Sequence, residues 1–370
     1  MKTKVVEYIG RIQDGGAESI VRDYALTLNK YIFDVYIVCR DYKKESNVYK
    51  TLINNNVKII TLYPKFNIFH RFLARILGAK YVSNKFAKVI NNIKPNVIHC
   101  HLECLETVYY AKNYLDNIKL LFTCHNLPEL CIGKNRPREH KACKYLIKNN
   151  NLHIIALHDE MAKEINSMFN INDTIVIKNG INFAKYRNII ETKDEIKQSF
   201  NIPRDAYIIG QIGRYDYQKN QDFSIKIFKK LLEEKPNSYL LLIGRGKDEK
   251  KIKSLIKKYN IQKNVLLLKN RDDIPRLLKM MDVFLFPSRY EGLGIVLIEA
   301  QVMGLPCLVS ENIPQEAFQS KNIVKLNLND PINNWINSLL NPVCNINNFG
   351  NINDYDIKYV VRKLEREYLI

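Results

Sequence analysis

The sequence predicts an α/β protein made of two doubly wound parallel-sheet domains in series. Its 370 residues exceed what one hydrophobic core usually serves, so two domains of about 150 to 200 residues are expected. Short β-branched runs alternate with helical patterns along most of the chain, which is typical of a parallel sheet covered by helices. This alternation loosens once, at residues 177–195, where polar and turn-forming residues collect. We therefore expect an N-terminal domain over residues 1–183 and a C-terminal domain over 184–370.

The elements of the N-terminal domain begin with the strand "KVVEYIG" and a helix over residues 17–30. Five further strands follow, "FDVYIVC", "KIITLY", "NVIHCH", "LLFTCH" and "HIIAL". The second domain restarts with "AYIIGQIG", a helix over 220–235, "SYLLLIG" and a helix over 248–259, then "VLLL", "VFLFP" and "PCLVS". Ligands of open parallel sheets bind beyond the carboxyl ends of the strands, so two such sheets facing each other imply a cleft between the domains.

Composition and charge limit the class of protein. Apolar residues make up 46% and charged residues 26%, which argues against global disorder. The 57 Lys and Arg against 38 Asp and Glu give +19, so some face should attract phosphate, nucleic acid or acidic lipid. The start "MKTKVVEYIG" does not resemble a signal peptide, and no uncharged apolar run reaches 18 residues. We expect a cytoplasmic protein that at most touches a membrane surface.

The eight cysteines are interpreted as reduced thiols. Cys39, Cys100, Cys124 and Cys307 lie in short apolar runs that look like buried strands, and no CxxC pair occurs. The alternative is a metal site around "HCHLEC", residues 99–104. Alternate residues of a strand point to opposite faces, so Cys100 cannot join the two flanking histidines without distortion. We expect no metal.

The segment "SRYEGLGIVLIEAQVMGLPCLVS", residues 288–310, carries two glutamates in an apolar run. Glu299 falls inside a predicted helix that Gly304 and Pro306 end. Glu291 lies in the preceding loop, which also contains Gly292, Leu293 and Gly294, where backbone can approach a ligand closely. A partly desolvated Glu299 needs strong donors, such as the hydroxyl pair of a sugar or ribose. A salt bridge to a neighbour on the helix is the alternative.

Two glycine-containing strand ends are suited to phosphate. In "GQIGRYDYQKNQDF", Arg214 and Lys219 lie between a strand and a helix, where two cations suit a pyrophosphate, although a solvated surface pair is the alternative. In "IQDGGAESIV", Gly15 and Gly16 precede a helix whose free backbone amides would favour phosphate oxygens. An ordinary turn explains these glycines equally simply.

"EGLGIVLIE" resembles the E-x7-E motif of retaining glycosyltransferases of family 4, which have the two-domain GT-B fold. The resemblance covers essentially the whole chain. It implies that Glu299 binds the ribose hydroxyls of a nucleotide and that Glu291 lies beside the hydroxyls of the donor sugar. It also implies that Arg214 and Lys219 neutralise the diphosphate leaving group, and that the last helix returns to the N-terminal domain.

The resemblance assigns further residues of the cleft. "DGGAE" is similar to the family's N-terminal loop, whose glycines, here Gly15 and Gly16, lie near diphosphate and acceptor. His125 matches a histidine that contacts the donor sugar, although a lone histidine in this place is often structural. His101 matches a histidine at a strand end, and Gly244 of "GRG" matches a loop that borders the nucleotide.

Two features depart from the family pattern or imitate another one. The family usually has Ser where His158 stands, so a contact at that strand end is not carried over. "DYD", residues 354–356, imitates the metal-binding DxD of other transferases but lies in the C-terminal tail, and GT-B enzymes do not need it. We therefore expect no metal and no cofactor, with the nucleotide sugar as a substrate.

A basic segment at residues 64–88 is a candidate membrane contact. Aromatic and aliphatic residues alternate there with six cations and no acidic residue: Lys65, Arg71, Arg75, Lys80, Lys85 and Lys88. This pattern suits a helix on an anionic membrane surface, and equally an amphipathic helix packed on the core of the domain. The family often acts on lipid-linked acceptors, which favours the membrane.

The segments "IEAQ" and "GLPCLVS" are similar to the corresponding segments of the EpsF-type exopolysaccharide enzymes of the family. The resemblance implies a metal-independent hexosyltransferase, peripheral at the inner face of the cell membrane. It would move a sugar, with retention, from a UDP-sugar to a lipid-linked saccharide in exopolysaccharide or capsule biosynthesis. The alternative is a GT-B-fold UDP-sugar epimerase. A nucleic-acid-binding protein is not expected, because no binding module is recognisable.

Overall fold

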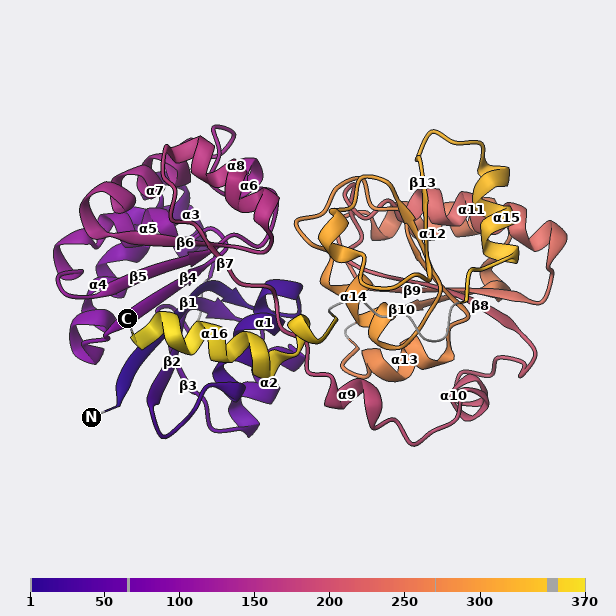
Figure 1. Ribbon diagram of the computed structural model, residues 1–370, viewed down its shortest axis with the longest axis horizontal. Coiled ribbons are helices and arrows are strands. Elements are labelled where there is room, and N and C mark those ends of the chain that lie inside the picture. Colours follow the sequence, from indigo (N-terminus) through magenta and orange to yellow (C-terminus); the bar gives the residue numbers. More distant parts are fainter. Residues whose placement is uncertain (1, 65–66, 270, 345–351, 370) are drawn as a thin grey trace. The chain divides into compact units, whose positions relative to one another are not determined.

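The computed structural model describes residues 2–64, 67–269, 271–344 and 352–369. The chain divides into two compact units, one formed by Met1–Ile181 with Asp354–Ile370 and the other by Asn182–Asn353. We call them unit 1 and unit 2. Each contains one parallel sheet flanked by helices (Figure 1). The chain thus enters unit 2 after Ile181, where we expected a boundary after residue 183, and its last helix, α16 (Ile357–Leu369), belongs to unit 1.

Unit 1 contains a seven-stranded sheet in which every neighbouring pair is parallel. Its strands are β1 (Thr3–Ile12), β2 (Phe33–Tyr42), β3 (Lys58–Thr61), β4 (Val97–His101), β5 (Lys119–Thr123), β6 (Leu152–Ala156) and β7 (Ile175–Val176). The order is β3-β2-β1-β4-β5-β6-β7. The direction of winding therefore reverses between β1 and β4, which is where ligands of such sheets bind.

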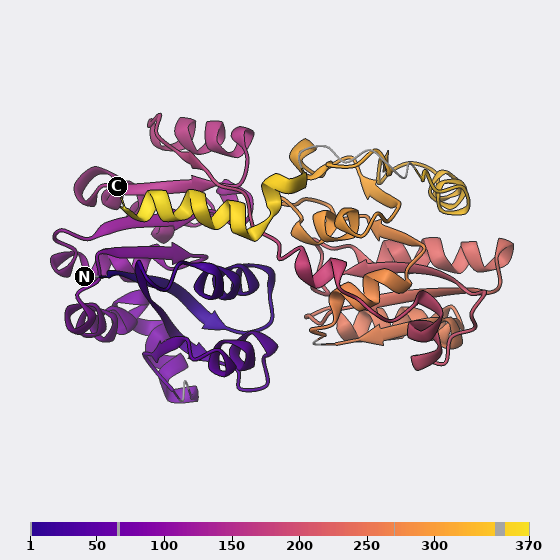
Figure 2. The same cartoon turned by 60° about the horizontal axis from the view of Figure 1, so that its bottom comes forward.

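Helices cover both faces of this sheet. They are α1 (Gly16–Thr27), α2 (Asn47–Asn54), α3 (Ile68–Leu77), α4 (Ala79–Ile93), α5 (Leu105–Tyr110), α6 (Pro128–Cys131), α7 (Pro137–Asn150), α8 (Asp159–Phe169) and α16. Alternation along β1 sends Val5 to the face covered by α1 and α16. Tyr8 points to the other face, where its ring meets Phe86 of α4 with centroids 4.3 Å apart. Figures 1 and 2 both show α16, in yellow, lying along unit 1.

Unit 2 repeats the same topology with six parallel strands. They are β8 (Tyr207–Ile212), β9 (Ser238–Ile243), β10 (Val265–Leu268), β11 (Val283–Phe286), β12 (Cys307–Ser310) and β13 (Ile323–Leu326), in the order β10-β9-β8-β11-β12-β13. The helices are α9 (Ala184–Arg187), α10 (Lys193–Ser199), α11 (Gln221–Glu234), α12 (Glu249–Lys258), α13 (Ile274–Met280), α14 (Ile295–Val302) and α15 (Ile332–Leu340). Here the winding reverses between β8 and β11. Two doubly wound parallel sheets confirm the predicted fold class.

Two strands and one helix differ from expectation. β7 and β13 are short and half-buried strands at sheet edges, so their sequences lack the apolar runs on which the prediction depended. The expected helix over residues 64–88 is two helices, because Gly78 between α3 and α4 has φ +60°.

The two helices also face different surroundings. α4 packs into the core through Val82, Phe86 and Ile90, whereas α3 leaves Ile68 83% exposed and also exposes Phe72, Ile76 and Leu77. Lys85 Nζ donates to a backbone carbonyl 3.2 Å away and lies 4.0 Å from the centroid of the Tyr63 ring, so this cation is engaged by the protein itself. Lys65 and the side chains of Arg71 and Arg75 lie outside the described residues.

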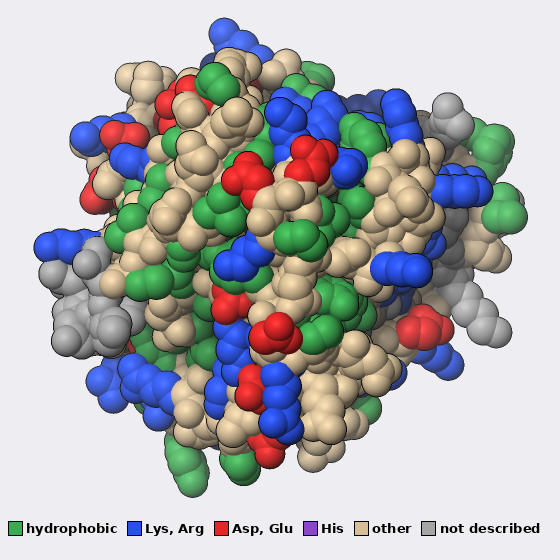
Figure 3. Space-filling view, turned by 90° about the vertical axis from the view of Figure 1, so that its right-hand side faces the viewer, with side chains coloured by type: hydrophobic (Ala, Val, Ile, Leu, Met, Phe, Trp, Pro, Cys, Tyr) green, Lys and Arg blue, Asp and Glu red, His purple; other side chains and the backbone are tan. Residues whose placement is uncertain are grey.

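The surface carries charges of both signs, and the thiols are free. Figure 3 shows a face on which Lys and Arg side chains are interspersed with Asp, Glu and apolar residues. Across the described residues, no helix is both long and apolar enough to cross a membrane. All eight cysteines are free, and the four predicted to be core thiols are buried.

Candidate active site

Lys219 and Glu291 form a buried ion pair at the point where the winding of unit 2 reverses. Lys219 lies in the loop after β8 and Glu291 in the loop after β11, and their Nζ and Oε1 atoms are 2.6 Å apart. The two side chains are 14% and 6% exposed. The pair therefore brings together two of the predicted site residues, 72 positions apart in sequence, where the topology predicts a ligand.

Neighbouring side chains hold both members of this pair. Gln218 Nε2 lies 3.3 Å from Glu291 Oε2 and 3.1 Å from the Tyr290 carbonyl, so one amide links the two loops. Gln211 of β8 donates to the Lys219 carbonyl at 2.6 Å. The Lys219 ammonium also lies 4.8 Å from the centroid of the Phe286 ring. Because solvent hardly reaches the ions, their field on a bound ligand is weakly screened.

Arg214 shares the loop of Lys219, but its side chain points elsewhere. It is 68% exposed, and its Nε pairs with Asp216 Oδ2 at 2.7 Å. Of the expected convergence of two cations and two carboxylates, the contact between Lys219 and Glu291 is seen directly. An exposed arginine paired over two residues can reorient at little cost.

Glu299 lies inside α14, where the sequence predicted a helix, and is half-buried. Gly294, with φ +80°, precedes the first residue of this helix, and Gly304, with φ +74°, follows its end. Gly292 and Leu293 are buried in the loop between Glu291 and the helix. The two glycines at positive φ thus set where the helix carrying Glu299 begins and ends.

Gly244 has a packing reason to be glycine. Its φ is +150°, and a methyl group on its Cα would collide with the carbonyl oxygen of Gly213 in the loop after β8. The same two loops are joined by a hydrogen bond from Tyr215 N to the Arg245 carbonyl at 2.9 Å. Gly244 therefore brings the end of β9 against the loop that carries Arg214 and Lys219.

A polar hollow of about 330 Å³ lies at the carboxyl ends of the strands of unit 2 and was not predicted. Its wall includes Arg289, whose guanidinium lies 4.4 Å from the centroid of the Tyr217 ring and donates to Asn220 Oδ1 at 2.8 Å. Arg289 N also donates to the Gln218 carbonyl at 2.8 Å, so the hollow shares its walls with the loops of the ion pair. The remaining lining residues are Glu311, Asn312, Asn327, Leu328 and Asn329.

The predicted glycine loop of unit 1 carries an acidic side chain at the place expected to bind phosphate. Gly15 precedes α1 and Gly16 begins it. Glu18, only 6% exposed, folds back so that a methyl group on Gly15 would collide with its carboxylate. A phosphate at this helix end would meet that negative charge, which the sequence argument from backbone amides did not include.

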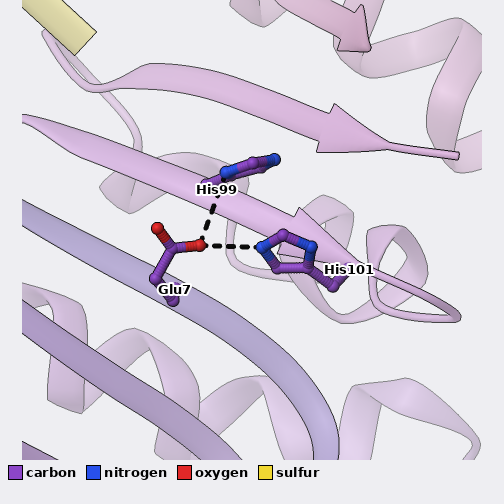
Figure 4. Close-up of side chains that lie close together, drawn as sticks. All are labelled: Glu7, His99 and His101. Atoms are coloured by element: carbon purple, nitrogen blue, oxygen red, sulfur yellow. Dashed lines mark hydrogen bonds and ion pairs between the residues drawn. The ribbon is translucent and has the colours of Figure 1, made fainter. Parts of the chain in front are cut away.

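His101 and His125 meet at the reversal point of unit 1. His101 ends β4 and His125 follows β5 by two residues; His101 Nδ1 and His125 Nε2 are 2.9 Å apart. His101 Nε2 lies 2.7 Å from Glu7 Oε2 of β1 (Figure 4), and both residues are fully buried. Burial lowers the pKa of His125 well below its ordinary value, so its ring is neutral near pH 7.

Glu7 was missed by the sequence prediction, although a signal was present. A charged residue in the middle of "KVVEYIG", a central strand, needs a partner, since an unpaired buried charge is costly. Tyr368 of α16 donates to Glu7 Oε1 at 2.7 Å and was missed for a different reason, since 361 positions separate it from Glu7.

Glu7, His99 and His101 are also close enough to be considered as metal ligands, with candidate atoms all within 4.8 Å. However, Glu7 Oε2 and His101 Nε2 are 2.7 Å apart, whereas ligand atoms around zinc lie about 3.3 Å from one another, given bonds of about 2.0 to 2.1 Å. Hydrogen bonds account for each of these atoms. Cys100 pairs in register with Tyr8 and Glu7 with His99, so the thiol points away from the histidines as expected.

His158 and the acidic tail have local structural roles. His158 Nδ1 accepts from Met161 N at 3.2 Å and so caps α8, as a serine in this position would. Asp354 pairs with Lys178 at 3.2 Å, and Asp356 pairs with Ile181 in an isolated β-bridge where the chain returns to unit 1.

Comparison with family models gives two matches that follow one another along the chain. Residues 14–185 match the model described as Glycosyltransferase Family 4, and residues 192–324 match the one described as Glycosyl transferases group 1. The first match includes the histidines of unit 1 and the second includes Lys219, Glu291 and Glu299.

Two relatives show the level of sequence similarity. The chain is 33% identical over 165 residues to a protein named as the glycosyltransferase EpsF of Bacillus subtilis (strain 168), covering 44% of this chain and 43% of the relative. It is 34% identical over 171 residues to a UDP-Gal:alpha-D-GlcNAc-diphosphoundecaprenol alpha-1,3-galactosyltransferase of Escherichia coli, covering 45% and 44%. The matched stretches thus span less than half the length of these two relatives.

Solved structures match over nearly the whole chain. Anabaena Alr3699/HepE, in complex with UDP and glucose, gives a TM-score of 0.78 at 17% identity, covering 99% of both chains. WaaG, described as a glycosyltransferase involved in lipopolysaccharide biosynthesis, gives 0.70 at 15% identity, covering 98% and 94%. At these identities the match establishes the fold.

Proposed function

Since the chain belongs to the GT-B glycosyltransferases of the family 4 and group 1 types, we propose that it transfers a hexose from a nucleotide sugar to a saccharide acceptor. The observation that carries this proposal is the buried pair of Lys219 and Glu291 at the reversal point of unit 2. Breaking a glycosyl phosphate bond develops negative charge on the departing diphosphate, and stabilising that charge is the main electrostatic task.

Lys219 and Arg214 are the two cations proposed for the diphosphate. Lys219 is fixed and shielded from solvent, so water screens its interaction with a ligand placed beside it only weakly, while the Glu291 carboxylate offsets part of its charge. Arg214 is exposed and long enough to swing from Asp216 onto a phosphate, where its guanidinium can bind two oxygens at once. Glu291 is the acceptor for hydroxyl groups of the sugar, and Glu299 for those of the ribose.

We propose that the donor is a UDP-sugar. This proposal is supported by the uridine nucleotides named with the relatives: HepE was solved with UDP, and the Escherichia coli relative is named for UDP-Gal. Transfer with retention of configuration, and without a metal, follows from the family resemblance and is part of the proposal. The same transferase names favour transfer over epimerisation.

The proposed acceptor is a lipid-linked saccharide of exopolysaccharide or capsule biosynthesis. The Escherichia coli relative is named for a sugar on diphosphoundecaprenol, and such an acceptor lies at a membrane surface. The exposed apolar side chains of α3 suit a shallow contact with an anionic bilayer. We therefore propose that the protein acts at the inner face of the cell membrane.

The activity test combines the purified protein, a panel of UDP-sugars and undecaprenyl-diphosphate saccharides, and follows UDP release and product mass. Transfer predicts UDP release only when an acceptor is present. Free nucleotide sugar with an inverted centre would indicate the epimerase instead. Lys219→Met should lower kcat by about 100- to 1,000-fold, the scale of losing one preorganised donor. Lys229→Met, in an exposed pair with Glu233, is the matched control and should keep full activity.

The membrane contact is tested separately by sedimentation with anionic vesicles. Phe72→Ser should weaken vesicle binding by at least about tenfold, because it removes one exposed aromatic side chain worth roughly 1.5 to 3 kcal/mol when buried. The control is Tyr31→Ser. Tyr31 is an aromatic residue of the same unit that lies between α1 and β2 and is 91% exposed, and its replacement should leave vesicle binding unchanged. Equal binding by both variants would remove α3 from the proposal.

A further inference from the structure

A connected hydrogen-bond network lies beneath the predicted sugar contact His125. Glu7 is at its centre, fully buried in β1 between β2 and β4. One carboxylate oxygen accepts from Tyr368 at 2.7 Å, and the other lies 2.7 Å from His101 Nε2 and 3.4 Å from His99 Nδ1. Figure 4 shows both imidazoles directed at the same Glu7 oxygen. A charge buried to this extent is tolerated only when donors surround it.

With Glu7 taken as a carboxylate and one proton on each imidazole, counting protons along the network assigns a role to each nitrogen. An ionised Glu7 only accepts, so His101 Nε2 must carry the proton in that 2.7 Å bond. On this count His101 Nδ1 is an acceptor, and the atom facing it at 2.9 Å is His125 Nε2. His125 Nε2 therefore carries a proton as well. In a neutral ring this leaves His125 Nδ1 with a free lone pair.

The same assignment of protons applies to the hydrogen bonds between Tyr368, His99 and Thr123. The single hydroxyl proton of Tyr368 goes to Glu7, so its oxygen accepts from His99 Nδ1 at 2.7 Å. His99 Nε2 then accepts from the Thr123 hydroxyl at 2.7 Å. Burial lowers the pKa of His99 well below its ordinary value, as it does for His125, which agrees with neutral rings. Every donor in this branch has an acceptor.

The one nitrogen of the network left without a partner is His125 Nδ1, which is buried and has no hydrogen bond within the described chain. A buried polar atom without a partner is destabilising, so a ligand that brings a donor to this atom is bound favourably. Because Nδ1 bears a lone pair, the group that it selects must bring a proton, as a hydroxyl does. An ether, a fluorine or a carbonyl oxygen would meet a second lone pair.

We propose that Glu7 is a positioning residue that acts through His101 to hold His125 in the Nε2-protonated form, so that Nδ1 accepts a hydrogen bond from a substrate hydroxyl. The role of that hydroxyl in sugar transfer rests on the proposed function; the tautomer itself does not. Tyr368 donates a hydrogen bond to the second oxygen of Glu7. Neither Glu7 nor Tyr368 needs to touch the substrate.

The tautomer can be measured without any substrate. The chain has 7 histidines, so selective ¹⁵N labelling of the full-length protein gives a spectrum in which each imidazole can be assigned by His→Gln replacement. At pH 7 we expect His125 to show a protonated Nε2 and an unprotonated Nδ1. A His125 ring with Nδ1 protonated, or with both nitrogens protonated, overturns the proposal, and this wild-type measurement does not depend on any variant folding.

Two variants separate positioning from mere packing. Glu7→Leu keeps the volume but removes the acceptor of His101, so we expect the single tautomer of His125 to become a mixture. Tyr368→Phe is the matched control: it removes a hydrogen bond from the same carboxylate but leaves the Glu7, His101 and His125 contacts in place. We expect it to keep the single tautomer. A network that only supports the fold predicts the same spectrum for both variants.

Kinetics then link the tautomer to substrate. With the UDP-sugar that the protein turns over, Glu7→Leu should lower kcat/KM by roughly tenfold, the scale of one hydrogen bond. Tyr368→Phe should change it less than threefold. If the spectra follow the prediction but no UDP-sugar is turned over, the positioning role stands and the proposed function fails. If transfer occurs and kcat/KM of Glu7→Leu is unchanged, the substrate contact at His125 Nδ1 is wrong.

Discussion

Replacing Lys219 by Met should destabilise unit 2 and lower the urea concentration at which it unfolds. The change removes the partner of Glu291, a carboxylate that is 6% exposed, at a distance of 2.6 Å. Breaking a buried ion pair in this way costs about 3 to 5 kcal/mol, because the remaining charge stays buried. The Gln218 amide, 3.3 Å from Glu291 Oε2, still donates to the carboxylate. We therefore expect the lower end, about 3 kcal/mol.

The protein offers a convenient probe for this measurement. Trp335 is the sole tryptophan, and it is fully buried in α15 with its ring against Phe223 of α11. Its fluorescence therefore reports the unfolding of unit 2 without a contribution from unit 1. With a urea slope of about 2 kcal/mol/M, a loss of about 3 kcal/mol shifts the midpoint by about 1.5 M.

Two companion variants make the measurement decisive. Lys229→Met removes a cation from an exposed pair and should shift the midpoint by less than about 0.25 M, since such pairs contribute at most about 0.5 kcal/mol. The double replacement Lys219→Met with Glu291→Leu removes both charges and should recover at least about 2 kcal/mol relative to Lys219→Met alone. Equal midpoints for Lys219→Met and Lys229→Met would refute the buried pair.

The other predictions concern an exposed cation, two buried rings and a glycine. Arg214→Ala should leave the urea midpoint of unit 2 within about 0.25 M of wild type, because its side chain is 68% exposed, while lowering kcat by about 100-fold; an unchanged kcat would contradict its proposed role. The pKa values of His99 and His125 are lowered by burial, so below about pH 6.5 the unfolded chain binds protons that folded unit 1 does not. The free energy of unfolding of unit 1, followed by hydrogen exchange, should therefore fall from pH 7 to pH 5, by at most about 1.4 kcal/mol per pH unit for each ring; a flat profile would show that the rings titrate normally. Gly244→Ala should destabilise unit 2 by more than Gly304→Ala in the Trp335 assay, because both have positive φ but only Gly244 also faces a backbone oxygen.

The elements with strong local patterns were predictable from the sequence. The helix expected over 220–235 is Gln221–Glu234, and the one over 248–259 is Glu249–Lys258. Both follow a regular apolar period, which depends only on neighbouring residues. Glu299 was likewise placed correctly in a helix, since Gly304 and Pro306 mark its end in the sequence.

The contacts of the site were less predictable, because they join distant segments or arise from local competition. The sequence placed Lys219 and Glu291 in one site but could not show that they pair directly across 72 positions. Asp216, two residues from Arg214, captures that cation, and Glu18 turns back over Gly15. Residue spacing in the sequence could not predict these three contacts, because each depends on the direction and burial of a side chain.

The contact between Tyr368 and Glu7 also bears on how the protein is made. Glu7 leaves the ribosome 361 residues ahead of its partner, and all of unit 2 is translated between them. Until α16 is made, Glu7 Oε1 lacks its Tyr368 donor, while unit 2, which is continuous in sequence, can already fold. Maturation thus runs against the order of synthesis: the half that starts first is completed last.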